Sequence, residues 1–283
     1  MQTTEEKWDI VIVPDRKWYE LNLKEVYKYK DLIFLFVKRN FTAQYKQTIL
    51  GPLWFIINPL LSTFISTIIF GNIAGIESDG IPYFLFYLCG YTLWNYFSSC
   101  VTATSSTFTD NAHIMGKVYF PRLTMPISSV IYAAINMFIV FTMSIIALVV
   151  YNIMGYDIVP DYRIVVLPIL MLQTAVLGLG VGILVSSLTT KYRDLTILVS
   201  FGLQLWMYLT PVVYPISEVS GGLRILIFLN PMSAIVQNYK AVLLGCGEFA
   251  TGFWILSIGI TGIVFMLGVL LFNKVEKTFM DTV

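Results

Sequence analysis

Few side chains in this 283-residue sequence could carry covalent or acid–base chemistry. Its single histidine, His113, stands alone, and a lone histidine is more often a contact residue than a catalyst. The three cysteines, Cys89, Cys100 and Cys246, show neither metal-binding nor redox spacing, which favours buried structural roles. Segment 116–119 reads Gly-Lys-Val-Tyr, so it does not complete a phosphate-binding loop. The sequence therefore predicts neither an enzyme nor a metal site, and energy for uphill transport would have to come from another polypeptide.

The composition places these residues in a membrane. The chain is 57% hydrophobic and only 12% charged, whereas soluble domains carry roughly 25% charged residues. Six runs without charged residues or histidine are each long enough to cross a bilayer core as a helix. These runs are 47–76, 80–109, 123–156, 164–190, 195–217 and 249–273. We predict an all-α membrane protein with six transmembrane helices. Ion-coupled carriers keep ionisable groups at membrane depth, so their absence here argues against that class.

The basic residues predict that both termini lie in the cytoplasm. In that orientation, all of the 18 lysines and arginines except Arg163, Arg224 and Lys240 lie on the cytoplasmic side, as the positive-inside rule requires. A seventh apolar run, 225–239, is interrupted by Asn230-Pro231 and is too short to span. We therefore expect re-entrant helices that form an outer gate within 214–248.

Residues 1–50 predict a basic cytoplasmic segment that precedes a six-span membrane domain at 51–283. Over 20–41, apolar residues recur every three or four positions with charged residues between them. This is the pattern of a helix in the membrane interface, although packing on a partner protein explains it equally well. The candidate lipid-headgroup contacts are Lys38, Arg39 and Lys46.

The stretch 44–59 joins that segment to the first charge-free run. Gly51-Pro52 predicts a corner, because the residue before a proline is disfavoured in the α conformation. Pro59 then predicts a bend within the first span.

Two glycine pairs predict close helix packing. Gly178 and Gly182 form a small-residue face in the fourth run, and Gly259 with Gly262 forms a looser one in the sixth. Packing within one subunit and a contact between two subunits are equally good interpretations.

Two predicted cytoplasmic loops, 109–125 and 191–194, are suited to docking an energy-supplying partner. Asp110 could begin a short helix and Pro121 could end it. Tyr119 and Phe120 have no evident core to join, so we expect them to be exposed interface anchors; insertion among lipid headgroups is the alternative. The candidate coupling residues are Asp110, His113, Lys117, Tyr119, Phe120, Arg122, Tyr192, Arg193 and Asp194.

Several segments together resemble one family, the permease subunits of ABC exporters for lipid-linked polysaccharides such as O-antigen, capsule and teichoic acid. The resemblance covers nearly the whole chain. Its most specific segments are YKQTILGPLW at 45–54, KVYFPR at 117–122, YRD at 192–194, TPVVYP at 210–215 and LNPMSAIVQNYK at 229–240.

The resemblance implies a homodimeric, multi-pass protein of the bacterial inner membrane that binds two copies of a separate cytoplasmic ATPase subunit. ATP and Mg²⁺ would then bind that partner, with no cofactor on this chain. It further implies a coupling helix around 110–122 and re-entrant helices at 216–247. The substrate would be an undecaprenyl-linked glycan, whose identity the sequence does not specify.

Aromatic residues in the uncharged runs suit such a glycan, because flat apolar faces and hydroxyl groups allow a sugar chain to slide. Aromatic platforms serve single-stranded nucleic acids in the same way. An aromatic belt at the membrane interface is the alternative. The candidate channel residues are Trp54, Phe55, Asn58, Tyr91, Trp94, Tyr96, Met207, Tyr208 and Tyr214.

Two other functions are compatible with the sequence. The same architecture could export a small drug or lipid, or the chain could be a membrane scaffold for polysaccharide assembly that transports nothing. In the export hypothesis, closure of the ATPase pair pushes on 110–122 and separates the first and fifth spans of the two protomers.

Overall fold

The computed structural model describes residues 23–46, 48–189, 192 and 194–278, and every regular element among them is helical. The α-helices are α1 (Leu23–Lys28), α2 (Lys30–Tyr45), α3 (Trp54–Ser66), α4 (Tyr83–Ser105), α5 (Thr107–Met115), α6 (Thr124–Ile153), α7 (Leu167–Thr189), α8 (Leu195–Tyr208), α9 (Gly222–Leu229), α10 (Pro231–Leu244) and α11 (Thr251–Thr278). The shorter helical segments are η1 (Gly51–Leu53), η2 (Thr67–Ile73), η3 (Tyr162–Val166) and η4 (Ile216–Glu218). The predicted all-α class is confirmed for the described residues.

Four segments are long and apolar enough to cross a membrane. They are Gly51–Ile73, Thr124–Ile153, Tyr162–Thr189 and Thr251–Val275, which correspond to the predicted first, third, fourth and sixth spans. The predicted second and fifth spans are α4 and α8, and they do not meet the same criterion. Helix α8 has 14 residues, which corresponds to about 21 Å against a core of about 30 Å.

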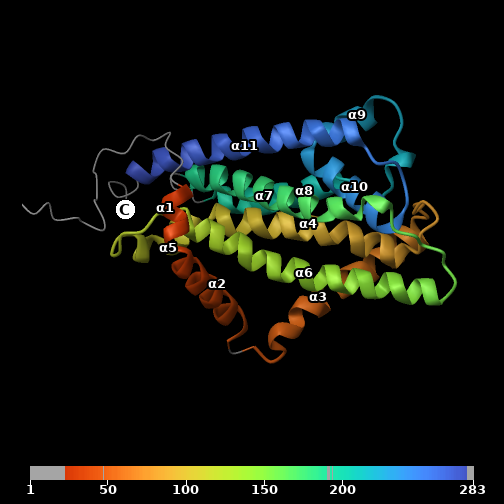
Figure 1. Cartoon of the computed structure of the whole chain (residues 1–283), viewed down its shortest axis with the longest axis horizontal. Helices are drawn as coiled ribbons and strands as arrows, with labels where there is room; N and C mark the ends of the chain where they lie inside the picture. The colour runs from red at the N-terminus through yellow and green to blue at the C-terminus, as the bar shows by residue number, and fades with distance from the viewer. Residues whose placement is uncertain (1–22, 47, 190–191, 193, 279–283) are drawn as a thin grey trace, which may run out of the picture.

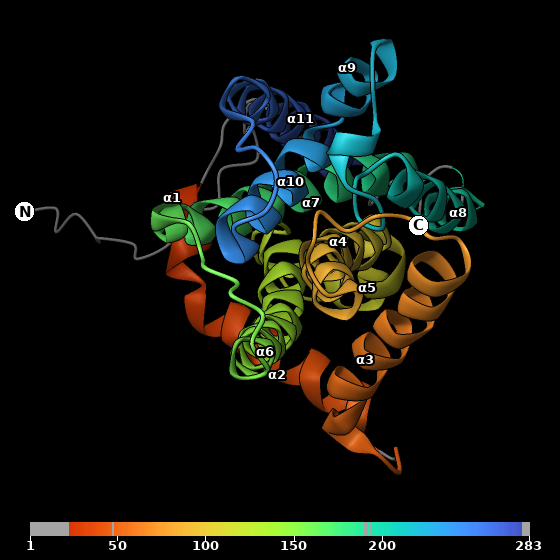
Figure 2. The same ribbon diagram turned by 90° about the vertical axis from the view of Figure 1, so that its right-hand side faces the viewer.

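The long helices α4, α6, α7 and α11 run side by side along the longest axis (Figure 1). Helices α1, α2 and α5 lie at one end of this bundle, and α9 lies at the other. Seen along the bundle, α4 occupies the centre, with α3, α6, α7, α8 and α10 around it (Figure 2). Sixteen residues of α4 are buried, so most of its aromatic side chains pack against the neighbouring helices.

The predicted corner between α2 and α3 is present. Gly51 has a φ of +51°, a left-handed conformation that glycine adopts at little cost, and Pro52 lies in the first turn of the short helix η1. The two helices consequently form a V (Figure 1). Pro59 lies inside α3, which continues to Ser66 and then widens into the π-helical segment η2.

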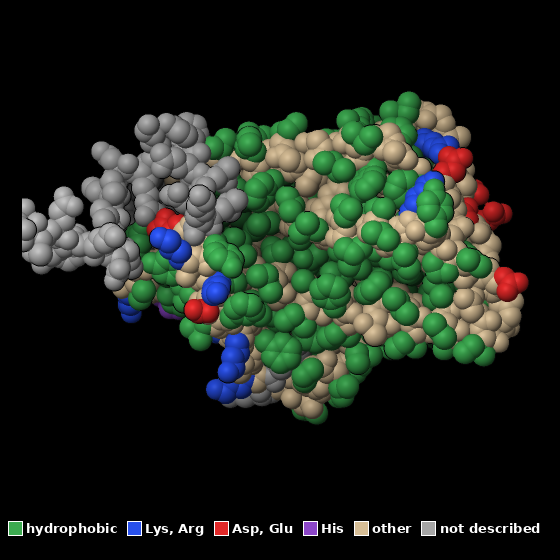
Figure 3. All heavy atoms as spheres, in the orientation of Figure 1, with side chains coloured by type: hydrophobic (Ala, Val, Ile, Leu, Met, Phe, Trp, Pro, Cys, Tyr) green, Lys and Arg blue, Asp and Glu red, His purple; other side chains and the backbone are tan. Residues whose placement is uncertain are grey.

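Charged side chains on the face shown in Figure 3 gather towards the two ends of the bundle, while apolar side chains cover its middle. This distribution matches a helix bundle whose long axis crosses the bilayer, because a charged side chain at the bilayer centre costs several kcal/mol, about 2.5–3.5 on insertion scales.

The glycines of α7 pack within this subunit. A Cβ atom on Gly178 would lie 2.7 Å from Cys100 Cβ, and one on Gly182 would overlap the hydroxyl of Thr104. Both contacts bring α7 against α4. Gly259 and Gly262, in contrast, would have no atom within 4 Å of an added Cβ. Of the two interpretations of the first glycine pair, the structure supports intrasubunit packing.

Gly182→Ala is therefore expected to destabilise the bundle, because the added methyl group forces α4 and α7 apart. Overpacking of this kind costs about 1–3 kcal/mol. Thermal unfolding of the purified protein in lipid nanodiscs should show a lower apparent Tm. Gly259→Ala is the matched control and should leave the Tm unchanged. Equal Tm values for the two variants would contradict the packing described here.

Candidate functional site

The segment after α4 folds back onto the N-terminal helices at one end of the bundle. Phe120 is only 5% exposed, and its ring centroid lies 5.8 Å from that of Phe36 on α2. Phe108 and Met115 of α5 belong to the same apolar cluster. The expectation that Phe120 is an exposed anchor is therefore wrong, because α2 supplies a core that the sequence did not reveal.

Most of the other predicted coupling residues are exposed. Tyr119 is 48% exposed and follows Val118, which is 60% exposed. A hollow of about 270 Å³ is lined by the chain from Met115 to Phe120 together with Arg122. Asp110, His113 and Lys117 are also exposed, and Arg122 is half-buried.

The second predicted loop begins beside the first. Thr189 Oγ1, at the end of α7, donates a hydrogen bond of 2.8 Å to the Ser105 carbonyl oxygen at the end of α4. Tyr192 and Asp194 are exposed, and Arg193 lies outside the described residues. The helices α4 and α7, which lead into the two predicted coupling loops, therefore end side by side.

The α2 helix packs on its own chain through one face. Ile33, Phe36 and Val37 are buried there, whereas Phe34 and Leu35 are 67% and 60% exposed. The amphipathic pattern left membrane contact and packing on a protein as alternatives. Helix α2 packs on its own chain and still presents an apolar face outward. The predicted start of this helix, at residues 20–22, lies outside the described residues.

The basic residues of this segment have different surroundings. Lys38 and Lys46 are exposed. Arg39 is exposed too, but its Nη2 donates a 3.2 Å hydrogen bond to Asn111 Oδ1 of α5, and its guanidinium carbon lies 4.9 Å from the centre of the Phe36 ring. Arg39 therefore joins α2 to α5 as well as facing outward.

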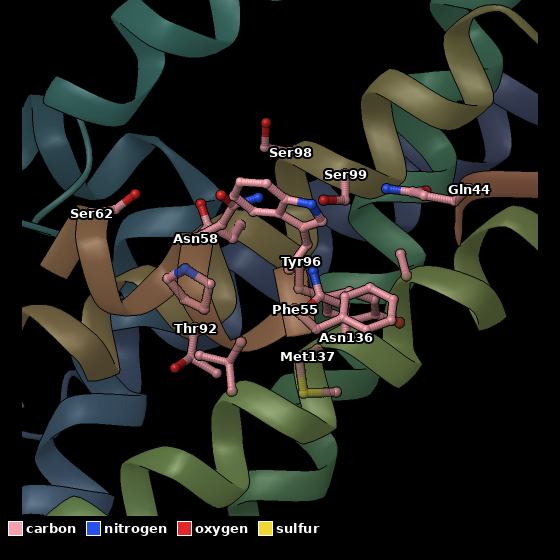
Figure 4. Close-up of a pocket in the computed structure, with 15 residues that line it drawn as sticks. Gln44, Phe55, Asn58, Ser62, Thr92, Tyr96, Ser98, Ser99, Asn136 and Met137 are labelled. Carbon is pink, nitrogen blue, oxygen red and sulfur yellow. The ribbon is translucent and has the colours of Figure 1, made fainter. Parts of the chain in front are cut away.

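A polar cleft with a volume of about 290 Å³ lies between α3, α4 and α6. Four predicted channel residues, Trp54, Phe55, Asn58 and Tyr96, line it. Figure 4 shows Gln44 of α2 at one end of this hollow and Ser62 of α3 at the other. The remaining lining residues are Pro59, Thr92, Asn95, Ser98, Ser99, Ala133, Asn136, Met137 and Val140.

Sequence reasoning missed the amides of this cleft. Asn95 and Asn136 each interrupt an apolar run, but a search for ionisable residues passes over neutral side chains. An amide at membrane depth needs hydrogen-bond partners as much as a hydroxyl does. Asn136 could therefore have been used to predict a polar site within the membrane.

The predicted aromatic residues of α4 do not share one surface. Tyr91 is 8% exposed, and its hydroxyl lies 2.9 Å from Ser66 Oγ. Trp94 is 3% exposed and borders a smaller hollow of about 200 Å³ against α8, which Gln204 also lines. Because successive helical residues are turned by about 100°, Tyr96 faces the cleft instead.

The C-terminal end of α8 and the chain that follows it carry the other predicted channel residues. Tyr208 is 50% exposed and Met207 is partly buried. The Tyr214 hydroxyl donates a 3.3 Å hydrogen bond to the Tyr208 carbonyl oxygen, so the chain turns back at this point. Helices α9 and α10 follow, as two short helices separated at Asn230, whose side chain caps α10.

Lys240 of α10, one of the three basic residues that the predicted orientation places on the outer side, is buried. It is 2% exposed, and its Nζ donates hydrogen bonds of 2.8 Å to the carbonyl oxygens of Pro211 and Val212. The same nitrogen lies 3.5 Å from the centre of the Phe86 ring. These contacts satisfy the ammonium group and fasten α10 to the chain that leaves α8.

Comparison with known proteins identifies the architecture. Residues 31–244 match the family model described as "ABC-2 type transporter". The chain belongs to the ABC-2 type transporter family. This ABC-2 permease is similar to two proteins called O-antigen export system permease protein RfbA. The one from Myxococcus xanthus is 29% identical over 78% of this chain and 83% of its own length. The one from Klebsiella pneumoniae is 28% identical over 89% of this chain and 94% of its own length.

The family establishes the general role of the chain. The protein is a multi-pass membrane permease, and the match is to the transmembrane domain of such transporters and not to an ATPase domain. An ABC permease works with an ATPase subunit, so the predicted external source of energy is confirmed at the level of the family.

The different burial of Tyr119 and Phe120 predicts different effects of the same substitution. Phe120→Ala leaves a cavity against Phe36 and should cost about 3–5 kcal/mol, seen as a lower apparent Tm of the purified protein. Tyr119→Ala removes a half-exposed ring and should leave the Tm nearly unchanged. A similar decrease in Tm in both variants would contradict the conclusion that Phe120 is buried while Tyr119 is half-exposed.

Proposed function

We propose that this ABC-2 permease exports undecaprenyl-linked O-antigen, or a related polysaccharide, across the bacterial inner membrane. The similarity to two O-antigen export permeases over most of the chain carries this proposal. The cleft supports it, because amides, hydroxyls and aromatic rings line its walls. Such groups hydrogen-bond sugar hydroxyls and contact apolar sugar faces without holding a passing chain through charge.

In the proposed transporter, α4 and α8 complete six spans and both termini lie in the cytoplasm. Residues 1–50 form the cytoplasmic segment and 51–283 the permease domain, with a coupling segment at 109–125 and an outer gate at 214–248. Two permease subunits associate with two ATPase subunits, which bind ATP and Mg²⁺. The fastening of α10 to the end of α8 supports a gate whose parts move together.

We propose that the first and fifth spans, α3 and α8, form the dimer contact and move during transport. Helix α3 exposes Phe64 and Ile65 at 57% and 52%, and α8 exposes Ile197 and Phe201 at 73% and 58%. Figure 2 places both helices along the same flank of α4. Closure of the ATPase pair would push on the exposed coupling residues and separate these helices from their partners, opening a path past Trp94, Met207, Tyr208 and Tyr214.

Depletion of the permease should cause lipid-linked glycan to accumulate in the cytoplasmic leaflet, as measured by leaflet-specific labelling. Wild-type protein should reverse the accumulation. Tyr119→Ala should not, because it removes an exposed contact for the ATPase while leaving the fold intact.

Normal glycan at the outer surface after depletion would overturn polysaccharide export and would favour a small drug or lipid as substrate. An ATPase subunit should also copurify with the permease in a 2:2 ratio. Absence of any ATPase would favour a scaffold instead.

We also propose that Lys38 and Lys46 attract the pyrophosphate of the lipid-linked substrate, with Arg39 contributing beside its bond to Asn111. The double variant Lys38→Glu/Lys46→Glu should reduce outer-surface glycan several-fold, because two attractive charges become repulsive. Lys274→Glu, at an exposed position on α11, is the matched control. Unchanged export by the double variant would refute the headgroup role.

A further inference from the structure

The cleft between α3, α4 and α6 is rich in hydrogen-bonding groups and lacks charge. Of the 15 described residues that line it, none is Asp, Glu, Lys, Arg or His. Sites for phosphate or carboxylate use charged donors, and sites for hard cations use carboxylates. The lining therefore favours a ligand that is polar but uncharged.

Aromatic rings complete this chemistry. Trp54 is 40% exposed at the cleft, while Phe55 and Tyr96 are each 5% exposed and form its buried wall. A sugar ring has apolar C–H faces and a rim of hydroxyl groups. Flat rings beside Asn58 and Asn136 offer complementary surfaces for both parts of such a ligand.

Asn136 has an unused hydrogen-bonding atom. Its Oδ1 is buried and has no hydrogen-bond partner among the described residues. Two other polar groups of the cleft already have partners: Gln44 Oε1 accepts a 2.8 Å bond from the Tyr132 hydroxyl, and Thr92 Oγ1 donates to the Leu88 carbonyl oxygen. A buried acceptor without a donor is expensive, and a hydroxyl group of a bound ligand would satisfy it.

The size and place of the cleft limit what it can bind. Its volume of about 290 Å³ lies at the small end of ligand pockets, which span about 300–1,000 Å³, so it suits a sugar unit and not a long segment of polymer. Its described lining comes from α2, α3, α4 and α6, and none comes from α8. Each protomer therefore has its own cleft, separate from the α8 residues of the proposed path.

We propose that this cleft is a lateral sugar-binding subsite that takes one uncharged sugar unit of the glycan. Asn136 Oδ1 accepts a hydrogen bond from a sugar hydroxyl, and Trp54 and Tyr96 contact the ring. The assignment rests on glycan export as the proposed function, and it adds a preference for neutral sugars at a site within each subunit.

Saturation-transfer NMR on the permease–ATPase complex in nanodiscs tests this subsite. The probes are neutral tetrasaccharides of glucose, galactose and mannose, with tetragalacturonate as the charged counterpart. The wild-type complex should bind a neutral tetrasaccharide in preference to tetragalacturonate. Asn136→Leu should weaken that binding about tenfold, as expected for the loss of one hydrogen bond.

Two further variants keep the result interpretable. Trp54→Ala changes a partly exposed ring and should also weaken binding without unfolding the protein. Asn72→Leu makes the same amide-to-leucine change at an exposed position outside the cleft and should bind like wild type. Equal binding by wild type and Asn136→Leu, stronger binding of tetragalacturonate, or no binding of any neutral probe would each overturn the subsite.

The outcomes also separate this inference from the proposed function. Retained sugar binding together with normal surface glycan after depletion would refute export alone. Glycan accumulation in the cytoplasmic leaflet together with unchanged binding by Asn136→Leu would refute the subsite alone.

Discussion

Hydrogen bonds between neutral side chains join the helices of this bundle at membrane depth. Gln173 of α7 donates to Ser257 of α11 at 2.8 Å and accepts from Trp254 at 2.8 Å, and the Tyr91 hydroxyl meets Ser66 across α3 and α4. An unsatisfied polar group in hydrocarbon is costly, yet each interhelical bond in a membrane contributes only about 0.6–2 kcal/mol. Such bonds specify which helix faces meet, and they can be broken and remade more cheaply than buried ion pairs.

Packing is uneven around this framework. Glycines draw α7 close to α4, and they do the same between α7 and α11, where a Cβ on Gly180 would lie 2.8 Å from Phe265 Cα. Helices α3 and α8 have no comparable glycine contacts in the described chain and expose large apolar side chains. Close glycine packing therefore holds the central helices together, whereas α3 and α8 lack it. This contrast supports the proposal that α3 and α8 are the elements that move and meet across the dimer.

The two ends of the bundle are fastened by different chemistry. At the end of the bundle where α1, α2 and α5 lie, the tilted contact between the rings of Phe36 and Phe120 and the Arg39–Asn111 hydrogen bond join α2 to the predicted coupling segment. A force on the exposed Tyr119 would consequently reach the helix that leads into α3. Towards the opposite end, Lys240 holds the chain after α8 through two carbonyl oxygens. The intervening helices connect these ends, and the cleft lies beside α4 between them.

Charge-free runs and the bias of basic residues were sufficient to predict an all-α membrane protein, because the cost of burying charge in lipid acts on sequence directly. The corner at Gly51 and the break at Asn230 were predictable for a similar reason, since proline and its neighbours restrict backbone conformation locally. The burial of Phe120 and Lys240 was not predictable, because α2 and the chain after α8 reach them from distant parts of the sequence. Likewise, Tyr91, Trp94 and Tyr96 share one aromatic run, but helix rotation and the positions of α3, α6 and α8 decide that only Tyr96 meets Asn58 and Asn136. Local composition determined which residues enter the membrane, and long-range packing determined which of them face one another.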